Sequence, residues 1–357
     1  MSDPALRPSR RYLTMVVASL SLIVLSCVAF LVPVPYVTMR PGPAFDTFGK
    51  INDKPMISFG EGVKTYPTTG SLDFTTVSVT RAETNVSLAQ AVEAYFADDT
   101  AVVPRSFIYR QGVSAKDAKA EGQAQLASSK DSSRVAALRA AGYTVPEMPT
   151  IDSVGADGSA KGKLQVGDEI SSVDGRSTTT ARDVVEAVGR IEPGDTVTIS
   201  FIRDGEKQSV DIITRPDAIN KELPRIGVML RSTFDFPITI TNNVGEQVGG
   251  PSAGAMFALA IYDRLTPGSL TGGREVAGTG EITPDGTIGP IGGIRQKIAG
   301  AADDGAKVFL VPAANCAEAS GGDDHGMRLV KVSKLDDAID SLEELADDSK
   351  ATVPRCL

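Results

Sequence analysis

Two residues near the C-terminus, Ser252 and Lys297, have the types and surroundings of a nucleophile and a general base. Ser252 follows a Gly-Gly-Pro sequence and is soon followed by a wholly apolar run, residues 255–261. A helix that is apolar on every side is a buried helix. Ser252 is therefore expected at the start of a buried helix, where free N–H groups and the helix dipole can stabilise an oxyanion beside an accessible hydroxyl.

Lys297 lies on an apolar face of a second expected helix. The face is defined by residues at helical spacing, Ile294, Ile298, Ala301 and Ala302. Burial disfavours the charged ammonium and lowers its pKa, which a lysine needs before it can act as a base near neutral pH. Taken singly, a serine at a helix start is commonly an N-cap and a lysine on an apolar face commonly extends its amine to water. The presence of both residues favours a catalytic pair over an N-cap serine and a solvated lysine.

Three sequence blocks around these residues carry a family resemblance. The blocks are "GPSAG" at Gly250–Gly254, "TGEIT" at Thr279–Thr283 and "PIGGIRQK" at Pro290–Lys297. In order and spacing they resemble the signature of Lon-type proteases, which are Ser–Lys peptidases. One departure is the "VGG" before the proline, where ATP-dependent members often carry Lys-Asp-Gly. This departure concerns the oxyanion hole and not the catalytic pair.

The resemblance implies a role for each matching residue. Ser252 would be the nucleophile and Lys297 the general base, while the hydroxyl of Thr279 would lie beside the lysine and orient its amine. The supporting positions are Thr279, Gly250, Pro251 and Ala253.

The composition excludes several classes of protein. A net charge of −9 argues against nucleic acid as a partner. The single histidine, His325, cannot form a two-histidine metalloprotease motif, and the three cysteines lack metal-ligand spacing, so no metal is expected. The chain has no phosphate-binding G-x-x-x-x-G-K-[ST] motif, so no ATP or other cofactor is expected. At 357 residues, two or three domains are expected.

The N-terminus predicts a membrane anchor. Basic residues precede a long apolar run, which favours a cytoplasmic tail at 1–11, a transmembrane helix at 12–36 and an extracytoplasmic remainder in the cell membrane. A cleaved signal peptide would have a shorter apolar core, and a lipoprotein signal would use Cys27 but fits poorly before it. Each of the three alternatives places the enzyme outside the cytoplasm.

The segment between the anchor and the catalytic region divides in two. Residues 37–145 are of mixed helix and strand character, with a strand at 72–80, a helix at 87–96 capped by Ser87, and a polar helical stretch without assigned chemistry. Residues 146–216 resemble a PDZ domain, in a pattern carried by Leu164, Gly167, Asp168, Ile170, Val173 and Gly175.

A PDZ module implies binding of an extended peptide end by strand addition. The candidate residues for holding that end are Gly142, Tyr143, Thr144 and Val145. The alternative is that the module restricts access to the protease or positions it.

The proteolytic domain is expected at 225–348, with a buried strand at 307–312 and an amphipathic helix near its end, and the whole chain is expected to be α+β. Outside the anchor the only cysteines are Cys316 and Cys356, which could form a disulfide in an oxidising compartment.

These features predict an ATP-independent, membrane-anchored serine endopeptidase that cleaves extracytoplasmic proteins or peptides. Its partners would be a protein or peptide substrate and the membrane, through residues 12–36. Lon-type domains tend to assemble into rings, so the resemblance allows a homo-oligomer. The alternative function is a catalytically idle PDZ-containing surface protein that binds or scaffolds others.

Overall fold

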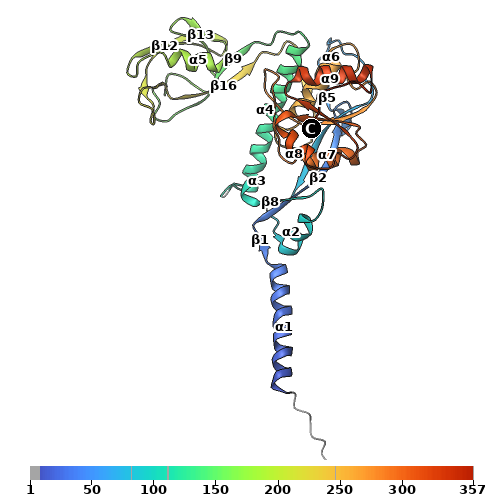
Figure 1. Cartoon of the computed structure of the whole chain (residues 1–357). Coiled ribbons are helices and arrows are strands. Elements are labelled where there is room, and N and C mark those ends of the chain that lie inside the picture. The colour runs from blue at the N-terminus through green and yellow to red at the C-terminus, as the bar shows by residue number, and fades with distance from the viewer. Residues whose placement is uncertain (1–8, 82, 111, 246, 357) are drawn as a thin grey trace, which may run out of the picture. The chain divides into compact units, whose positions relative to one another are not determined.

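The computed structural model describes residues 9–81, 83–110, 112–245 and 247–356 (Figure 1). The chain forms two compact units. The first unit consists of Met1–Ala141 and Ile240–Leu357, and the second, Gly142–Thr239, is inserted between those two parts. The predicted mixture of helices and strands is confirmed.

The N-terminal helix α1 (Arg10–Leu31) is exposed along its whole length. By length and composition its 22 residues could cross a membrane. The predicted apolar span extended to residue 36, but the helix ends at Leu31 because Pro33, which has no N–H to donate, lies just beyond it. Of the predicted tail 1–11, residues 1–8 lie outside the described part of the chain.

A six-stranded mixed sheet forms the centre of the first unit. Its order is β22 (Arg328–Val332), β21 (Val308–Pro312), β18 (Glu275–Gly278), β6 (Ser71–Val79), β2 (Tyr36–Asp46) and β8 (Ala101–Pro104). The first four strands are parallel, and β2 is antiparallel to both of its neighbours. The strand β21 is buried at every position, as expected for a parallel strand covered on both faces.

Four helices pack against this sheet, namely α6 (Gly254–Leu265), α7 (Ile294–Asp303), α8 (Cys316–Ser320) and α9 (Leu335–Asp347). A fifth, α4 (Ala115–Ala140), packs against two of them, α6 and α9. The helix α6 is buried almost throughout, as its apolar sequence predicts, and contacts β6, α4 and α9. The helices α7 and α8 share a core cluster with Ala277 of β18 and Phe309 of β21.

Short elements complete the first unit. They are β1 (Pro33–Val34), β3 (Lys50–Ile51), β4 (Lys54–Pro55), β5 (Ile57–Phe59), β7 (Val86–Ser87), α2 (Leu88–Tyr95), α3 (Arg105–Ile108), β17 (Ile240–Asn242), β19 (Glu281–Ile282), β20 (Ile288–Gly289) and a 3₁₀ turn (Ala313–Asn315). The predicted N-cap of the second helix is confirmed, since Ser87 and Gln90 form a capping box.

The second unit is a smaller β-rich module. It contains β9 (Glu147–Val154), β10 (Glu169–Val173), β11 (Arg176–Ser177), α5 (Ala181–Val188), β12 (Thr196–Arg203), β13 (Glu206–Ile213), β14 (Arg215–Pro216), β15 (Pro224–Arg225) and β16 (Val228–Phe234). The main sheet has the order β13-β12-β10-β9-β16, with β11 paired to β10. The strands β12 and β13 form a hairpin that turns at Asp204 and Gly205, which both have positive φ.

Two sequence-based boundaries differ from the structure. Residues 37–145, expected to be a separate segment, supply β2, β6 and β8 to the sheet of the first unit. Residues 225–239, expected to open the proteolytic domain, belong to the second unit because β16 pairs with β9 along seven register positions. Strand pairing between distant segments decides both boundaries, and it leaves no local signal in the sequence.

Cys316 and Cys356 are joined by a disulfide, with their Cα atoms 4.9 Å apart. Closing a loop with a sequence separation of 40 residues stabilises the folded state by about 4 kcal/mol in the chain-entropy account. We expect the double substitution Cys316→Ala/Cys356→Ala to lower the free energy of unfolding by about 2–4 kcal/mol in a urea titration. Equal unfolding midpoints for the wild-type chain and the double variant would contradict this prediction. So would three reactive thiols in the unfolded, unreduced wild-type chain, where the disulfide leaves only Cys27 free.

Candidate active site

The structure brings the side chains of Ser252 and Lys297 together. The Nζ atom of Lys297 lies 3.1 Å from the Oγ atom of Ser252. The serine lies two residues before the start of α6, and the lysine lies on the first turn of α7. The two helices thus place an amine and a hydroxyl in hydrogen-bonding contact across 45 residues of sequence.

The amine of Lys297 is almost completely removed from water, with 2% of the residue exposed. Its other hydrogen bond goes to the main-chain oxygen of Thr75 on β6, at 2.6 Å. In the described residues no carboxylate forms an ion pair with it. Burial lowers the pKa of Lys297 from 10.5 to about 7. A substantial fraction of this amine is therefore neutral at physiological pH and can accept a proton.

Thr279 does not orient the amine as the resemblance implied. Its hydroxyl donates to the main-chain oxygen of Ser252 at 3.0 Å, and the next N–H, of Gly280, donates to the same oxygen at 2.8 Å. The role expected of Thr279 falls instead to the main-chain oxygen of Thr75. Sequence reasoning missed Thr75 because a backbone acceptor leaves no residue-type signal.

The segment before the serine is held by α4, to which sequence reasoning assigned no chemistry. Ser129 Oγ donates to the main-chain oxygen of Pro251 at 2.8 Å, and the Gln123 side-chain amide donates to that of Val248 at 2.8 Å. Lys130 Nζ donates to the main-chain oxygen of Asn242 at 3.0 Å. These bonds fix three points along the segment that leads to Ser252. A helix polar on most sides is explained by this contact with a polar loop.

The supporting positions around Ser252 have different roles. The N–H of Gly250 donates to the main-chain oxygen of Gly122 on α4 at 2.9 Å, so it is not available to a substrate in this arrangement. Pro251 contributes no N–H. The N–H groups of Ser252 and Ala253 have no protein acceptor among the described residues. They are the donors that remain for an oxyanion.

Loss of the bond from α4 to Pro251 should affect turnover more than stability. We expect Ser129→Ala to lower kcat about five- to tenfold with little change in KM, because one hydrogen bond that positions the segment before Ser252 is lost. The matched control is Ser133→Ala, since Ser133 is equally buried on α4 but bonds to Lys130 of the same helix. The two variants are compared by peptide hydrolysis and by thermal unfolding. Equal kcat values for both would refute a positioning role for Ser129.

In the second unit, the predicted peptide-binding residues Gly142, Tyr143, Thr144 and Val145 precede β9. That strand lies inside the sheet, paired with β10 on one side and β16 on the other. It therefore has no open edge for a further strand. The loop before β9 therefore does not adjoin an open edge, and its role in holding a peptide end stays a prediction.

The edge beside α5 belongs to β16, which has no strand on its outer side within the described residues. The helix α5 contacts β16, and Val228 and Leu230 pack against the core cluster that includes Val184. Sequence reasoning assigned residues 225–234 to the proteolytic domain and so did not identify β16 as an edge strand of this module.

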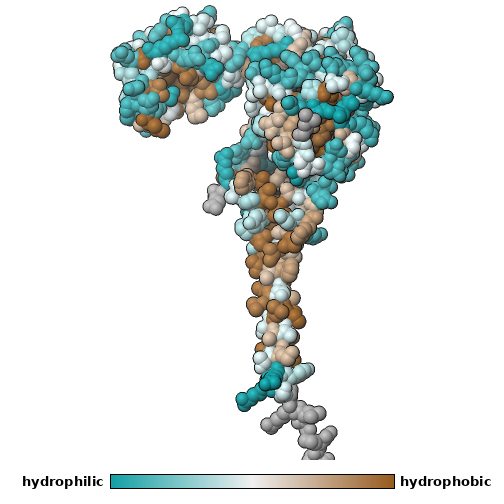
Figure 2. Space-filling model, in the orientation of Figure 1, coloured by the Kyte–Doolittle hydropathy of each residue, from teal (hydrophilic) through white to brown (hydrophobic). Residues whose placement is uncertain are grey.

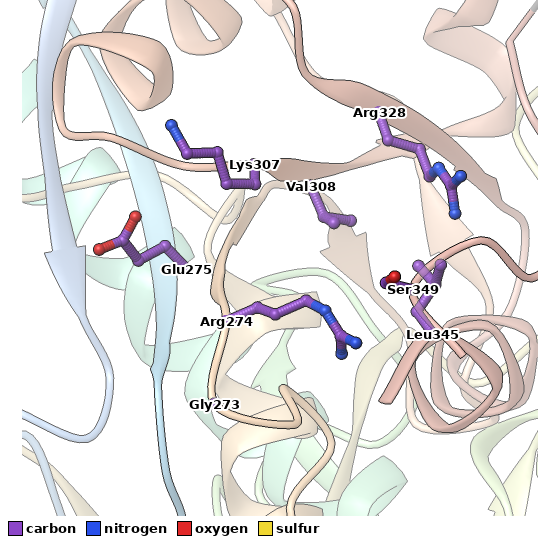
Figure 3. Close-up of a pocket in the computed structure, with 8 residues that line it drawn as sticks. All are labelled: Gly273, Arg274, Glu275, Lys307, Val308, Arg328, Leu345 and Ser349. Atoms are coloured by element: carbon purple, nitrogen blue, oxygen red, sulfur yellow. The ribbon is translucent and has the colours of Figure 1, made fainter. Parts of the chain in front are cut away.

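A pocket of about 530 Å³ lies elsewhere on the first unit (Figure 3). Its lining includes the first residues of β18, β21 and β22, namely Glu275, Val308 and Arg328. The Ser252–Lys297 pair lies beyond the other ends of these parallel strands, where Thr279 follows β18. The pocket is separate from the candidate active site.

Comparison with known proteins agrees with both units. Residues 244–343 match the family described as Lon protease (S16) C-terminal proteolytic domain, and residues 113–214 match the PDZ domain family. The PDZ match begins within α4, upstream of the compact unit at Gly142–Thr239.

Two Lon proteases match this chain over limited lengths. Lon protease 2 of Syntrophobacter fumaroxidans is 36% identical over 94 residues, covering 26% of this chain and 12% of the relative. Lon protease 1 of Bacillus subtilis is 27% identical over 175 residues, covering 48% of this chain and 22% of the relative. A solved PDZ domain of the SdrC-like protein of Listeria monocytogenes is 26% identical, covers 23% of this chain and 85% of that structure, and has a TM-score of 0.22.

The matched region thus spans less than a quarter of each of these two Lon proteases. The three sequence blocks, at residues 250–297, all lie within the Lon protease match at 244–343. The chain therefore carries a Lon-type proteolytic domain together with a PDZ domain, behind an N-terminal apolar helix.

Proposed function

We propose that the chain is an ATP-independent serine endopeptidase in which Ser252 and Lys297 form the catalytic pair. The observation that carries this proposal is the 3.1 Å contact between the buried amine and the serine hydroxyl. The lowered pKa of the lysine supports the role of general base, because a neutral amine is available near pH 7.

In the proposed mechanism the neutral amine of Lys297 accepts the proton of Ser252 as the serine oxygen attacks the scissile carbonyl carbon. The N–H groups of Ser252 and Ala253 donate to the resulting oxyanion. The tetrahedral intermediate collapses to an acyl-enzyme, and the lysine ammonium gives its proton to the leaving amine. Water, deprotonated by the same lysine, then releases the acyl group. The sequence of steps is that of a serine triad, with one amine replacing the histidine.

We further propose that α1 is a retained membrane anchor and that both units lie outside the cytoplasm. The helix is long and apolar enough to span a bilayer, and Arg10 and Arg11 flank its N-terminal end. Basic residues at that end favour a cytoplasmic N-terminus. Substrates would then be extracytoplasmic proteins or peptides, and the edge of β16 would bind an extended segment of them by strand addition.

The test is hydrolysis of an unfolded protein substrate by the full-length chain without nucleotide, with the cut sites identified by mass spectrometry. Cleavage that disappears in Ser252→Ala supports the proposal, provided that the variant unfolds at the same temperature. If the folded wild-type chain and Ser252→Ala are equally inert, the chain is instead a peptide-binding scaffold. Cleavage that requires ATP would contradict the ATP-independent mechanism.

A further inference from the structure

The helix α2 presents apolar side chains both to the core and to solvent. Ala91 and Ala94 are buried. An exposed apolar stripe, at i, i+4, i+7 and i+8, consists of Leu88, Val92, Tyr95 and Phe96. The last two residues are 73% and 78% exposed. A contiguous apolar surface of this kind usually has a partner, because leaving it in water is unfavourable.

A neighbouring hollow enlarges this surface. A pocket of about 340 Å³ lies against the apolar stripe, and every residue that lines it is apolar or aromatic. Val34, Tyr36 and Val102 contribute to the lining from the adjacent strands. The apolar surface is therefore formed jointly by three strands and a helix, and it does not depend on one exposed side chain.

The apolar stripe begins at the end of α1. The N–H of Leu88 donates to the main-chain oxygen of Val32, the C-cap of α1, at 3.2 Å, and Pro33 pairs with Ser87 in the β1–β7 ladder. A helix of 22 residues extends about 33 Å, close to the hydrocarbon thickness of a bilayer at about 30 Å. If α1 crosses the bilayer, Val32 and Leu88 lie at its outer boundary. Figure 2 shows the brown apolar surface continuing from α1 onto the adjoining part of the first unit.

We propose that the apolar stripe of α2 lies in the outer headgroup region of the bilayer that α1 crosses, an inference that rests on the anchoring proposed above. Aromatic side chains such as Tyr95 and Phe96 favour this region. The helix has no lysine or arginine, so its binding depends on apolar burial and does not require anionic lipid. The contact gives the first unit a second attachment to the membrane, which fixes its tilt where α1 alone would leave it free to rotate.

The absence of tryptophan from the chain permits a direct test. Three full-length variants are reconstituted in phosphatidylcholine vesicles without bromine or with bromine on the acyl chains, both at mid-chain and at the carbons nearest the headgroup. Phe96→Trp reports on the apolar stripe and Val24→Trp on the anchor. Tyr262→Trp is the matched aromatic control, since it lies on α6, at the opposite end of the first unit from α1 (Figure 1). We expect Val24→Trp and Phe96→Trp to lose about half of their emission in brominated vesicles and Tyr262→Trp to be unaffected.

Each outcome bears on a different part of the proposal. Quenching of Val24→Trp without quenching of Phe96→Trp overturns the α2 contact and leaves the anchor intact. No quenching of Val24→Trp overturns the anchor and the contact with it. A blue-shifted but unquenched Phe96→Trp places the stripe against protein, such as a second copy of the chain, and overturns the bilayer as its partner. Equal quenching of Phe96→Trp and Tyr262→Trp also overturns the proposal, because the contact would not be specific to the stripe.

Discussion

Lys297→Met should reduce kcat by about 10,000-fold while the chain remains folded, because the proposed mechanism has no other base in contact with Ser252. Among the described residues, the Ser252 hydroxyl forms a hydrogen bond with the lysine amine alone, at 3.1 Å. Methionine is similar in length to lysine and apolar, so it can occupy the same buried space. The measurement is single-turnover hydrolysis of a peptide at saturating concentration.

Two companion variants separate the base from the packing. Lys297→Arg keeps a positive charge but cannot lose its proton near neutral pH, so it should be as inactive as the methionine variant. Ser252→Ala should lose a similar factor, and the double variant should lose little more, because the two groups act as one unit. Additive losses in the double variant, or substantial activity in Lys297→Arg, would show that another group is the base.

The lowered pKa of Lys297 also has a consequence for stability. The folded pKa of about 7 lies below the unfolded value of 10.5, so the unfolded chain binds more protons between these pH values. The free energy of unfolding should therefore rise as pH increases from 7 towards 10.5, as far as this group is concerned. In Lys297→Met that contribution is lost, and the rise should be smaller in urea titrations across this range.

The candidate catalytic residues could be identified from the sequence because each has a suitable side chain and its burial follows from neighbouring residues. The apolar run after Ser252 and the apolar face around Lys297 specify two buried helix segments, and the structure contains both. That Ser252 and Lys297 act together was inferred from the resemblance to Lon-type proteases, because neither segment by itself indicates its partner. The sheet strands 72–80 and 307–312 were likewise predictable from their uninterrupted apolar or alternating patterns.

What the sequence did not reveal depends on contacts between distant segments. The acceptor for the lysine amine is a main-chain oxygen, at Thr75, and any residue type could supply it. The role of α4 depends on Ser129 and Gln123 meeting the loop before Ser252, and such polar residues on a polar helix look like a solvated surface. The edge strand β16 was not anticipated because its pairing with β9 joins residues about 80 apart, such as Thr233 and Met148.

The rate of cleavage should depend steeply on pH. The amine must be neutral to accept the serine proton, and its pKa is about 7. We therefore expect kcat/KM to rise about tenfold per pH unit below 7 and to level off above it. The cause is burial, since only desolvation contributes to the lowered pKa. The measurement is peptide hydrolysis from pH 5 to pH 9 at constant ionic strength.

Two other groups, one partly buried and one buried, could mimic this profile, and variants test them. Lys130 also has a lowered pKa from burial and the nearby Arg134, but its amine bonds to Asn242 and not to Ser252. Burial and the charge of Asp46 raise the pKa of Asp73 on β6 to about 6. Lys130→Met and Asp73→Asn should keep the midpoint near 7. A midpoint that disappears in either variant would assign the titration to that group, and a rate that falls as pH rises from 6 to 8 would refute the lysine as base. A midpoint that stays near 7 in both leaves the buried amine as the group whose proton must leave before the serine can attack.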